Sequence, residues 1–171
     1  MDGNHAGVEE KITVWPFPGA TQTTTTLYQH LHLPFPIADR HWVIRIGSNT
    51  RLYEESKHQA WERSWELDPR GPAVLAELPS SMREAASGAI WTPQVKGGWL
   101  LVAVGWGTLA FYQLDTDIGG WIPEGLVGRY AESTLKSLFA KTGTLADRAA
   151  AHYSAGHFPI YAPDGVAIEL R

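Results

Sequence analysis

Two histidines two positions apart are the residues of this 171-residue chain whose types and spacing most directly suggest chemistry. His30 and His32 follow a run of threonines, whose β-branched side chains favour a strand, and alternate residues of a strand share one face. Two imidazoles on one face are what zinc and related metals require. A third ligand is also needed, and nothing nearby in the sequence clearly supplies one, so we expect no metal site. His30 is instead a candidate general base.

A second group of candidates is Trp61, Arg63 and Trp65, which alternate with the acidic residues Glu62 and Glu66. On a strand the first three share a face, and an arginine between two tryptophans can stack on their rings. Two interpretations stay open for this face. It is either the aromatic wall of a cavity or a ladder on the outside of the sheet.

Tyr112 is the third candidate. It lies in an apolar stretch, residues 108–114, in which Ala110 and Leu114 fall on the same face of a strand. Its hydroxyl can bond a ligand or donate a proton, and packing in the core is the alternative. In an enzyme the catalytic residues would be His30, Tyr112 and Arg63, taken from a polar pool that also holds Arg45 and Glu62.

The composition excludes several classes of protein and leaves tryptophan in excess. The chain has no cysteine, which excludes disulfides, thiolate metal sites and a cysteine nucleophile. The net charge of −4 argues against a nucleic-acid binder, which usually carries a basic stripe. No run approaches the roughly 18 apolar residues of a membrane helix and the N-terminus has no apolar signal core, so we expect a cytoplasmic protein without membrane insertion. The 8 tryptophans outnumber the 5 phenylalanines, and tryptophan often lines ligand surfaces.

The elements that must position these residues are mostly strands. Period-two alternation between turn residues predicts strands as far as about Asp117. Lys96-Gly97-Gly98 is typical of a hairpin turn, and Gly105-Trp106-Gly107 joins the last two strands. The segments expected to form strands are 23–33, 41–46, 59–67, 99–104 and 108–114, with further strands at 50–54 and beginning at 89–92.

The hydrophobic period changes after Asp117. Apolar residues at helical spacing predict a long amphipathic helix at about 122–141, with a proline and an acid in its first turn. Gly143 interrupts the pattern, and 145–153 is expected to form a second, short helix. An antiparallel meander followed by one long helix is an α+β fold. One helix covers only part of such a sheet, so we expect a cavity over the remainder.

Two stretches carry a more specific pattern. Residues 34–43, PFPIADRHWV, resemble the P-x-P-x-x-x-R-[DE]-[FW]-V segment of START domains. Residues 115–127, DTDIGGWIPEGLV, resemble the strand-to-helix junction of the same domains, D-x-x-G-[GW]-x-[IL]-P-x-x-[LIV]-[VI]. In this order, with strands between them, they resemble the START/SRPBCC helix-grip superfamily, which is Bet v1-like. The similarity covers roughly residues 10 to 141 and is that of a bacterial START-like member with a shortened N-terminus.

The resemblance implies a curved antiparallel sheet that grips a long C-terminal helix, with a hydrophobic cavity between them. Members bind sterols, phospholipids, ceramide, polyketides and plant hormones, and some bacterial relatives are aromatase/cyclases. We therefore expect a carrier or sensor for a lipid, sterol or polyketide-like molecule, with no cofactor. The alternative is a cofactor-independent cyclase or aromatase that acts on a polyketide in the same cavity. The residues expected to bind the ligand are Trp42, Ile44, Trp61, Trp65, Trp99, Ala110, Tyr112, Leu126 and Tyr130.

The sequence departs from the family pattern in three places. His41 stands where an acid usually follows the motif arginine, Arg40, which we expect to fix its turn by pairing with Asp39 or a loop carbonyl. Far fewer residues precede Pro34 than in full START domains, and the chain continues past the long helix. The domain is thus expected at 11–155, between a flexible tail at 1–10 and an irregular tail at 156–171. The shortened N-terminus would leave a sheet edge or cavity wall open, and a second copy in a homodimer or the C-terminal tail would close it.

Overall fold

A computed structural model of the chain describes residues 12–33, 35–121, 126–152, 154 and 160–168, without the side chains of 126–134, 150, 152 and 160. The tail expected at 1–10 lies outside the described residues. The structure contains nine strands and four helical segments within these ranges. In chain order they are β1 (Ile12–Pro16), β2 (Thr24–Leu31), β3 (Arg40–Ser48), α1 (Thr50–Glu55), β4 (Ala60–Leu67), the 3-10 helix η2 (Gly71–Glu77), α2 (Ser80–Ala86), β5 (Ile90–Trp91), β6 (Gln94–Val104), β7 (Gly107–Asp117), α3 (Leu126–His152), β8 (Ile160–Tyr161) and β9 (Ala167–Ile168).

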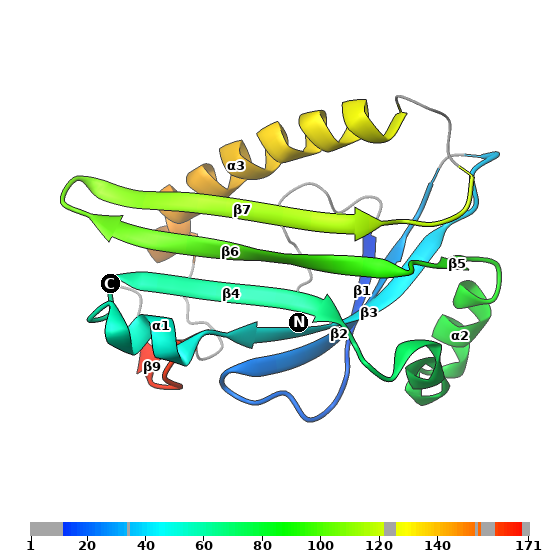
Figure 1. The fold of residues 1–171 in the computed structure, drawn as a ribbon, viewed down its shortest axis with the longest axis horizontal. Coiled ribbons are helices and arrows are strands. Elements are labelled where there is room, and N and C mark those ends of the chain that lie inside the picture. Colours follow the sequence, from blue (N-terminus) through cyan, green and yellow to red (C-terminus); the bar gives the residue numbers. More distant parts are fainter. Residues whose placement is uncertain (1–11, 34, 122–125, 153, 155–159, 169–171) are drawn as a thin grey trace.

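One twisted sheet and the long helix α3 make up the architecture (Figure 1). The strand order is β1-β2-β3-β4-β6-β7, with every neighbouring pair antiparallel, and β5 adds a short parallel pair to β3. Figure 1 shows α3 running along β7, with its C-terminal end passing behind the sheet. The α+β fold class, a curved antiparallel sheet with a C-terminal helix, is therefore confirmed.

The register of the strands divides their side chains between two faces, because successive residues point to opposite sides. Trp65 pairs with Ile46, and Trp99 pairs with Tyr112, so these four side chains share a face. The ring of Phe139 in α3 contacts Trp99 on that side, with ring centroids 5.4 Å apart. We call this side of the sheet the α3 face.

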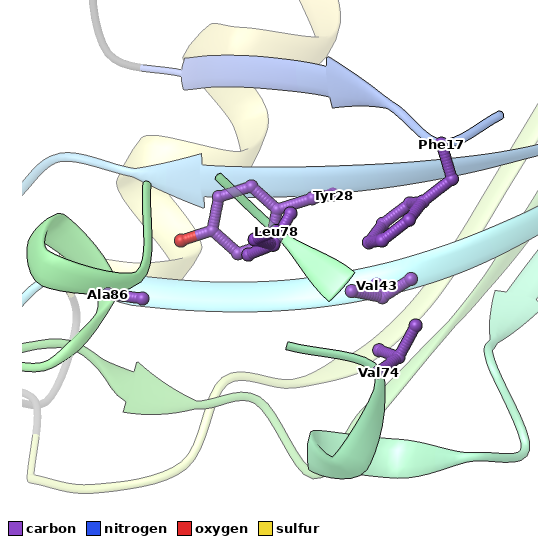
Figure 2. Close-up of a cluster of buried hydrophobic side chains, with 6 residues drawn as sticks. All are labelled: Phe17, Tyr28, Val43, Val74, Leu78 and Ala86. Carbon is purple, nitrogen blue, oxygen red and sulfur yellow. The ribbon is translucent and has the colours of Figure 1, made fainter. Parts of the chain in front are cut away.

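The opposite side, the α2 face, carries a small hydrophobic core at one end (Figure 2). Tyr28 of β2 and Val43 of β3 are fully buried there. The segment that contains η2 and α2 covers them with apolar side chains, and Phe17 closes the cluster from the end of β1. The side chains contributed by the covering segment are Val74, Leu78 and Ala86.

The glycines at 97 and 98 lie inside β6 and do not form the expected hairpin turn. A Cβ on Gly97 would stand 2.7 Å from the Trp65 ring and 2.6 Å from the carbonyl oxygen of Gln113. Gly97 therefore allows Trp65 to lie directly against β6, and the glycine serves close packing across strands rather than a turn. The hairpin joined at Gly105-Trp106-Gly107 is confirmed as the connection between β6 and β7.

Three predicted elements were wrong. Residues 50–54 form helix α1 instead of a strand, because the side chain of Asn49 caps the Leu52 N–H at 3.0 Å and begins a helix. The long helix passes through Gly143 and continues to His152, so the helix expected to end at 141 and the one expected at 145–153 are one element. A single glycine costs a helix only about 1 kcal/mol, which is too little to break it.

The C-terminal segment was expected to be irregular and instead contains a short antiparallel pair, β8 with β9. The hydroxyl of Thr50 at the start of α1 donates to the Pro163 carbonyl oxygen at 2.6 Å. Gly165 lies against Gln22, in the connection between β1 and β2. The described part of the C-terminal segment is thus held against α1 and the loop that precedes β2.

Candidate functional site

Four aromatic rings connect the sheet to α3. Trp99 and Tyr112 are direct partners on β6 and β7, and their ring centroids are 4.8 Å apart. Trp65 on β4 meets Tyr112 at 5.7 Å, and Phe139 on α3 meets Trp99 at 5.4 Å in an edge-on contact. Tilted and edge-on arrangements at these distances are favourable for aromatic pairs. Three of the four residues, Trp65, Trp99 and Tyr112, were predicted from the sequence to line a site, and the structure brings them together.

Apolar side chains around this contact stay open to solvent. Leu114 lies on the α3 face of β7, opposite Gly97, and is half-exposed. On α3, Leu135 and Phe139 are one turn apart, and both are exposed, as is Leu145. Partly uncovered apolar surface on two facing elements is typical of a binding groove. We use the name aromatic groove for this set of side chains on the α3 face and on α3, namely Trp65, Trp99, Tyr112, Leu114, Leu135 and Phe139.

One end of the α3 face is closed by a buried cluster. Trp42 and Ile44, both predicted ligand contacts, pack there with Leu31 and Val95. The Trp42 indole N–H donates to the side-chain oxygen of Gln29 at 2.7 Å, so its polar atom already has a partner. These side chains form the floor at this end of the aromatic groove rather than its open part.

The other end of the α3 face is capped by α1. Trp61, on the same face of β4 as Trp65, meets the buried ring of Tyr53 edge-on at 5.3 Å. Ala110 pairs with Leu101 on the same face, between the Trp61 end and Tyr112. The predicted residues Leu126 and Tyr130 belong to α3, but their side chains lie outside the described residues.

Arg63 places a positive charge on this face. It lies between Trp61 and Trp65 on β4 and is paired in register with Trp99. Within the described ranges no carboxylate forms an ion pair with it. Desolvation lowers the pKa of the guanidinium, which nevertheless stays charged at neutral pH. A polar end of a ligand is the partner that such a cation would suit.

His30 lies on the α2 face, so the three candidate catalytic residues are not brought together. Tyr112 and Arg63 point to the α3 face, while His30 alternates with Leu31 onto the other side and is buried. Its Nδ1 is 3.1 Å from the hydroxyl of Tyr28, and its Nε2 is 2.8 Å from Asp39 Oδ2. The set His30, Tyr112 and Arg63 therefore does not form one active site in this structure.

Asp39 is a partner of both histidines that the sequence analysis missed. Its Oδ2 also lies 3.0 Å from His32 Nδ1, and its Oδ1 accepts the Leu33 N–H at 2.9 Å. Partial burial raises the pKa of Asp39, but these hydrogen bonds outweigh it and leave the pKa below its ordinary value. The hairpin register contains the missing signal. Since Leu31 pairs with Arg40, the residue before Arg40 must return beside His32.

Arg40 joins the two segments that carry the START-like pattern. Its side chain is fully buried and donates from Nε to the Ile118 carbonyl at 2.8 Å and from Nη2 to the Gly119 carbonyl at 2.9 Å. Nη1 donates to the carbonyl oxygen of Ala38 within its own loop. The prediction that this arginine pairs with a loop carbonyl is confirmed. Its additional partners in the segment that leads to α3 were not foreseen.

A shallow hollow of about 270 Å³ opens on the α2 face, and its lining shares Trp65 with the aromatic groove. Its charged residues are Arg45, Glu66 and Lys96, and Arg45 and Glu66 are 3.4 Å apart in an exposed ion pair. Thr24, Gly47, Ser64 and Trp65 complete its lining. The hollow is polar and open, so it does not suit an apolar ligand.

The fold resembles that of a known protein. No family model and no curated protein matches the chain. Among solved structures it is similar to a STAR-related lipid transfer protein, fragment 25–204, from Xanthomonas axonopodis, with a TM-score of 0.52 and 20% identity. The match covers 81% of this chain and 67% of that one. The similarity is one of fold. Within the part of the chain that the structure describes, no helix is long and apolar enough to cross a membrane.

Proposed function

We propose that the protein is a START-like carrier or sensor, which binds a hydrophobic small molecule such as a lipid, sterol or polyketide-like compound in the aromatic groove. The observation that carries this proposal is the contact of Trp65, Tyr112, Trp99 and Phe139 between the sheet and α3, beside apolar side chains left open. The fold shared with a STAR-related lipid transfer protein supports it.

The surface of the groove suits binding by burial. Each Å² of apolar surface removed from water contributes roughly 25 cal/mol, so a ligand that buries about 300 Å² would gain about 7 to 8 kcal/mol before the cost of association. That gain is enough for useful affinity with few polar contacts. The aromatic rings supply large, rigid contact area at little cost in side-chain entropy.

The charge of Arg63 indicates the kind of polar end that the ligand carries. Arg63 lies between Trp61 and Trp65 on β4 and pairs in register with Trp99, on the α3 face. A guanidinium binds a carboxylate or phosphate oxygen with strong, directional hydrogen bonds. The proposed ligand is therefore an apolar molecule with one anionic or strongly polar end.

The test is a titration with two fluorescent probes, the fatty acid cis-parinaric acid and the uncharged hydrocarbon diphenylhexatriene, measured by energy transfer from tryptophan. Both probes should saturate with one site per chain. Trp99→Ala should weaken both by about tenfold or more, because it removes a central aromatic contact. Arg63→Met should weaken only the acid.

Trp106→Ala is the matched control, since Trp106 is exposed in the turn between β6 and β7. It should leave both affinities unchanged, and circular dichroism should show that each variant is folded. If wild-type protein gives no saturable signal, or if Trp99→Ala and Trp106→Ala bind equally well, the proposal fails.

A further inference from the structure

We propose that His30, His32 and Asp39 form a binding site for one divalent transition-metal ion of the zinc type, on the α2 face and separate from the aromatic groove. The three possible ligand atoms, His30 Nε2, His32 Nδ1 and Asp39 Oδ2, all lie within 4.8 Å of one another. Two imidazoles and one carboxylate are a donor set that zinc, cobalt and iron(II) accept, with further positions left for water.

The spacing of the ligand atoms fits a shared ion. His30 Nε2 is 2.8 Å from Asp39 Oδ2, and His32 Nδ1 is 3.0 Å from the same oxygen. Ligands held 2.0 to 2.2 Å from one metal ion are separated from each other by about 3 to 3.5 Å, so small movements would admit the ion. The two imidazole rings are stacked, with centroids 4.4 Å apart, and this contact holds both nitrogens toward the carboxylate.

The far side of each ligand is also held in place. His30 Nδ1 lies 3.1 Å from Tyr28 Oη, His32 Nε2 lies 3.1 Å from Thr13 Oγ1, and Asp39 Oδ1 accepts the Leu33 N–H. Metal-binding histidines usually carry their proton on the other ring nitrogen and donate it to such a partner. With the ion bound, the proton of each ring would therefore sit on the far nitrogen, where the Tyr28 and Thr13 oxygens accept it.

Exposure gives the site an entrance and a rigid base. The side chains of His30, Asp39 and His32 are 4%, 30% and 50% exposed, so the site is anchored in the protein and opens to solvent on the His32 side. His30 lies in β2, His32 just after it and Asp39 just before β3, so an ion would clamp the end of β2 to the start of β3. Arg40, the next residue, bonds to the segment before α3, and the clamp would therefore stabilise that junction as well.

The experiment is a titration of chelator-treated protein with Zn²⁺ by calorimetry and with Co²⁺ by visible ligand-field absorption. Wild type should bind one ion per chain with micromolar affinity or better, and Zn²⁺ should displace Co²⁺. His32→Ala changes a half-exposed side chain and should keep the fold while lowering affinity by more than about 100-fold. Thr13→Val, which keeps the shape but removes the outer hydroxyl, should lower it by about tenfold.

His58→Ala is the matched control. His58 belongs to a second histidine and carboxylate group, with Glu54 and Asp164, that is more exposed. Its replacement should leave the affinity and the Co²⁺ spectrum unchanged. The proposal is overturned if wild type binds no ion, in which case the three residues form an ion-paired cluster only. It is equally overturned if His32→Ala binds as tightly as wild type or if His58→Ala abolishes binding. Probe binding in the aromatic groove tests the proposed function independently of this result.

Discussion

Arg40 gives the clearest test of how the two START-like segments are held together. Its guanidinium is fully buried and donates to the carbonyl oxygens of Ile118 and Gly119 on one side and Ala38 on the other. Arg40→Met keeps most of the volume and the apolar stem but removes every donor. The partly buried carbonyl oxygens would then lose these donors.

The size of the effect follows from these contacts. A hydrogen bond to a charged group contributes about 1.5 to 3 kcal/mol, and the partly buried acceptors regain some of this from water once the guanidinium is gone. Removal of the buried charge also removes its desolvation cost, which offsets part of the loss. We therefore expect Arg40→Met to lower the free energy of unfolding by about 3 to 5 kcal/mol, a large share of the 5 to 15 kcal/mol typical of a domain.

The assay is urea unfolding followed by tryptophan fluorescence and circular dichroism, with Arg45→Met as the matched control. The Arg45 side chain is 47% exposed, and its contact with Glu66 is 3.4 Å long, so its replacement should change stability by no more than about 0.5 kcal/mol. If Arg40→Met costs less than about 1 kcal/mol, or no more than Arg45→Met, then Arg40 does not hold the junction. If Arg40→Met does not fold while Arg45→Met does, the role of Arg40 at the junction is tested instead with the milder variant Gly120→Ala.

Two further predictions concern stability. Gly120 has a φ of +68°, and a Cβ there would lie 2.8 Å from Arg40 Nη2. Gly120→Ala should therefore lower the free energy of unfolding in urea by about 1 to 3 kcal/mol. Gly105→Ala is the control, because a Cβ there meets nothing within 4 Å, and it should cost less than about 0.5 kcal/mol; equal costs would contradict the packing described. Side-chain hydrogen bonds from Arg70 lower the pKa of buried Asp68 below its ordinary 3.8. Because the pKa is lower in the folded state, this pair stabilises the protein above the ordinary pKa, and the contribution is lost as the pH falls through the folded value. Asp68→Asn should therefore show a smaller loss of stability than wild type between about pH 5 and pH 2, and an unchanged acid dependence would refute the assignment.

The aromatic positions of the α3 face could be predicted from the sequence because the strand period is two. Trp61, Arg63 and Trp65 lie on one face as expected, and so do Ala110, Tyr112 and Leu114. Which of the two faces meets α3 depends on how distant strands pair, and local alternation does not contain that information. The contact between Trp99 and Phe139 became visible only in the folded chain.

Asp39 and Gly97 were missed or misread for related reasons. Asp39 lies beyond the proline-containing loop, and the β2–β3 register places it beside His32. Gly97 was predicted to form a turn, but the Trp65 ring of β4, far away in sequence, occupies the space where a Cβ of residue 97 would lie. Gly143 was predicted to interrupt the helix, but the free-energy cost of one glycine is too small to end α3. In each case a tertiary contact or a summed local preference outweighed the single-residue signal.

Binding of an apolar ligand between the α3 face and α3 can be tested by photo-crosslinking with a diazirine-bearing fatty acid, with the labelled residues mapped by peptide mass spectrometry. We expect labels on β4, β6 and β7 residues of the α3 face, such as Trp99 and Tyr112, and on α3 near Phe139. Excess unlabelled fatty acid should suppress them. Labels that concentrate at the hollow lined by Arg45 and Lys96, or labels that excess ligand does not suppress, would contradict binding in the aromatic groove.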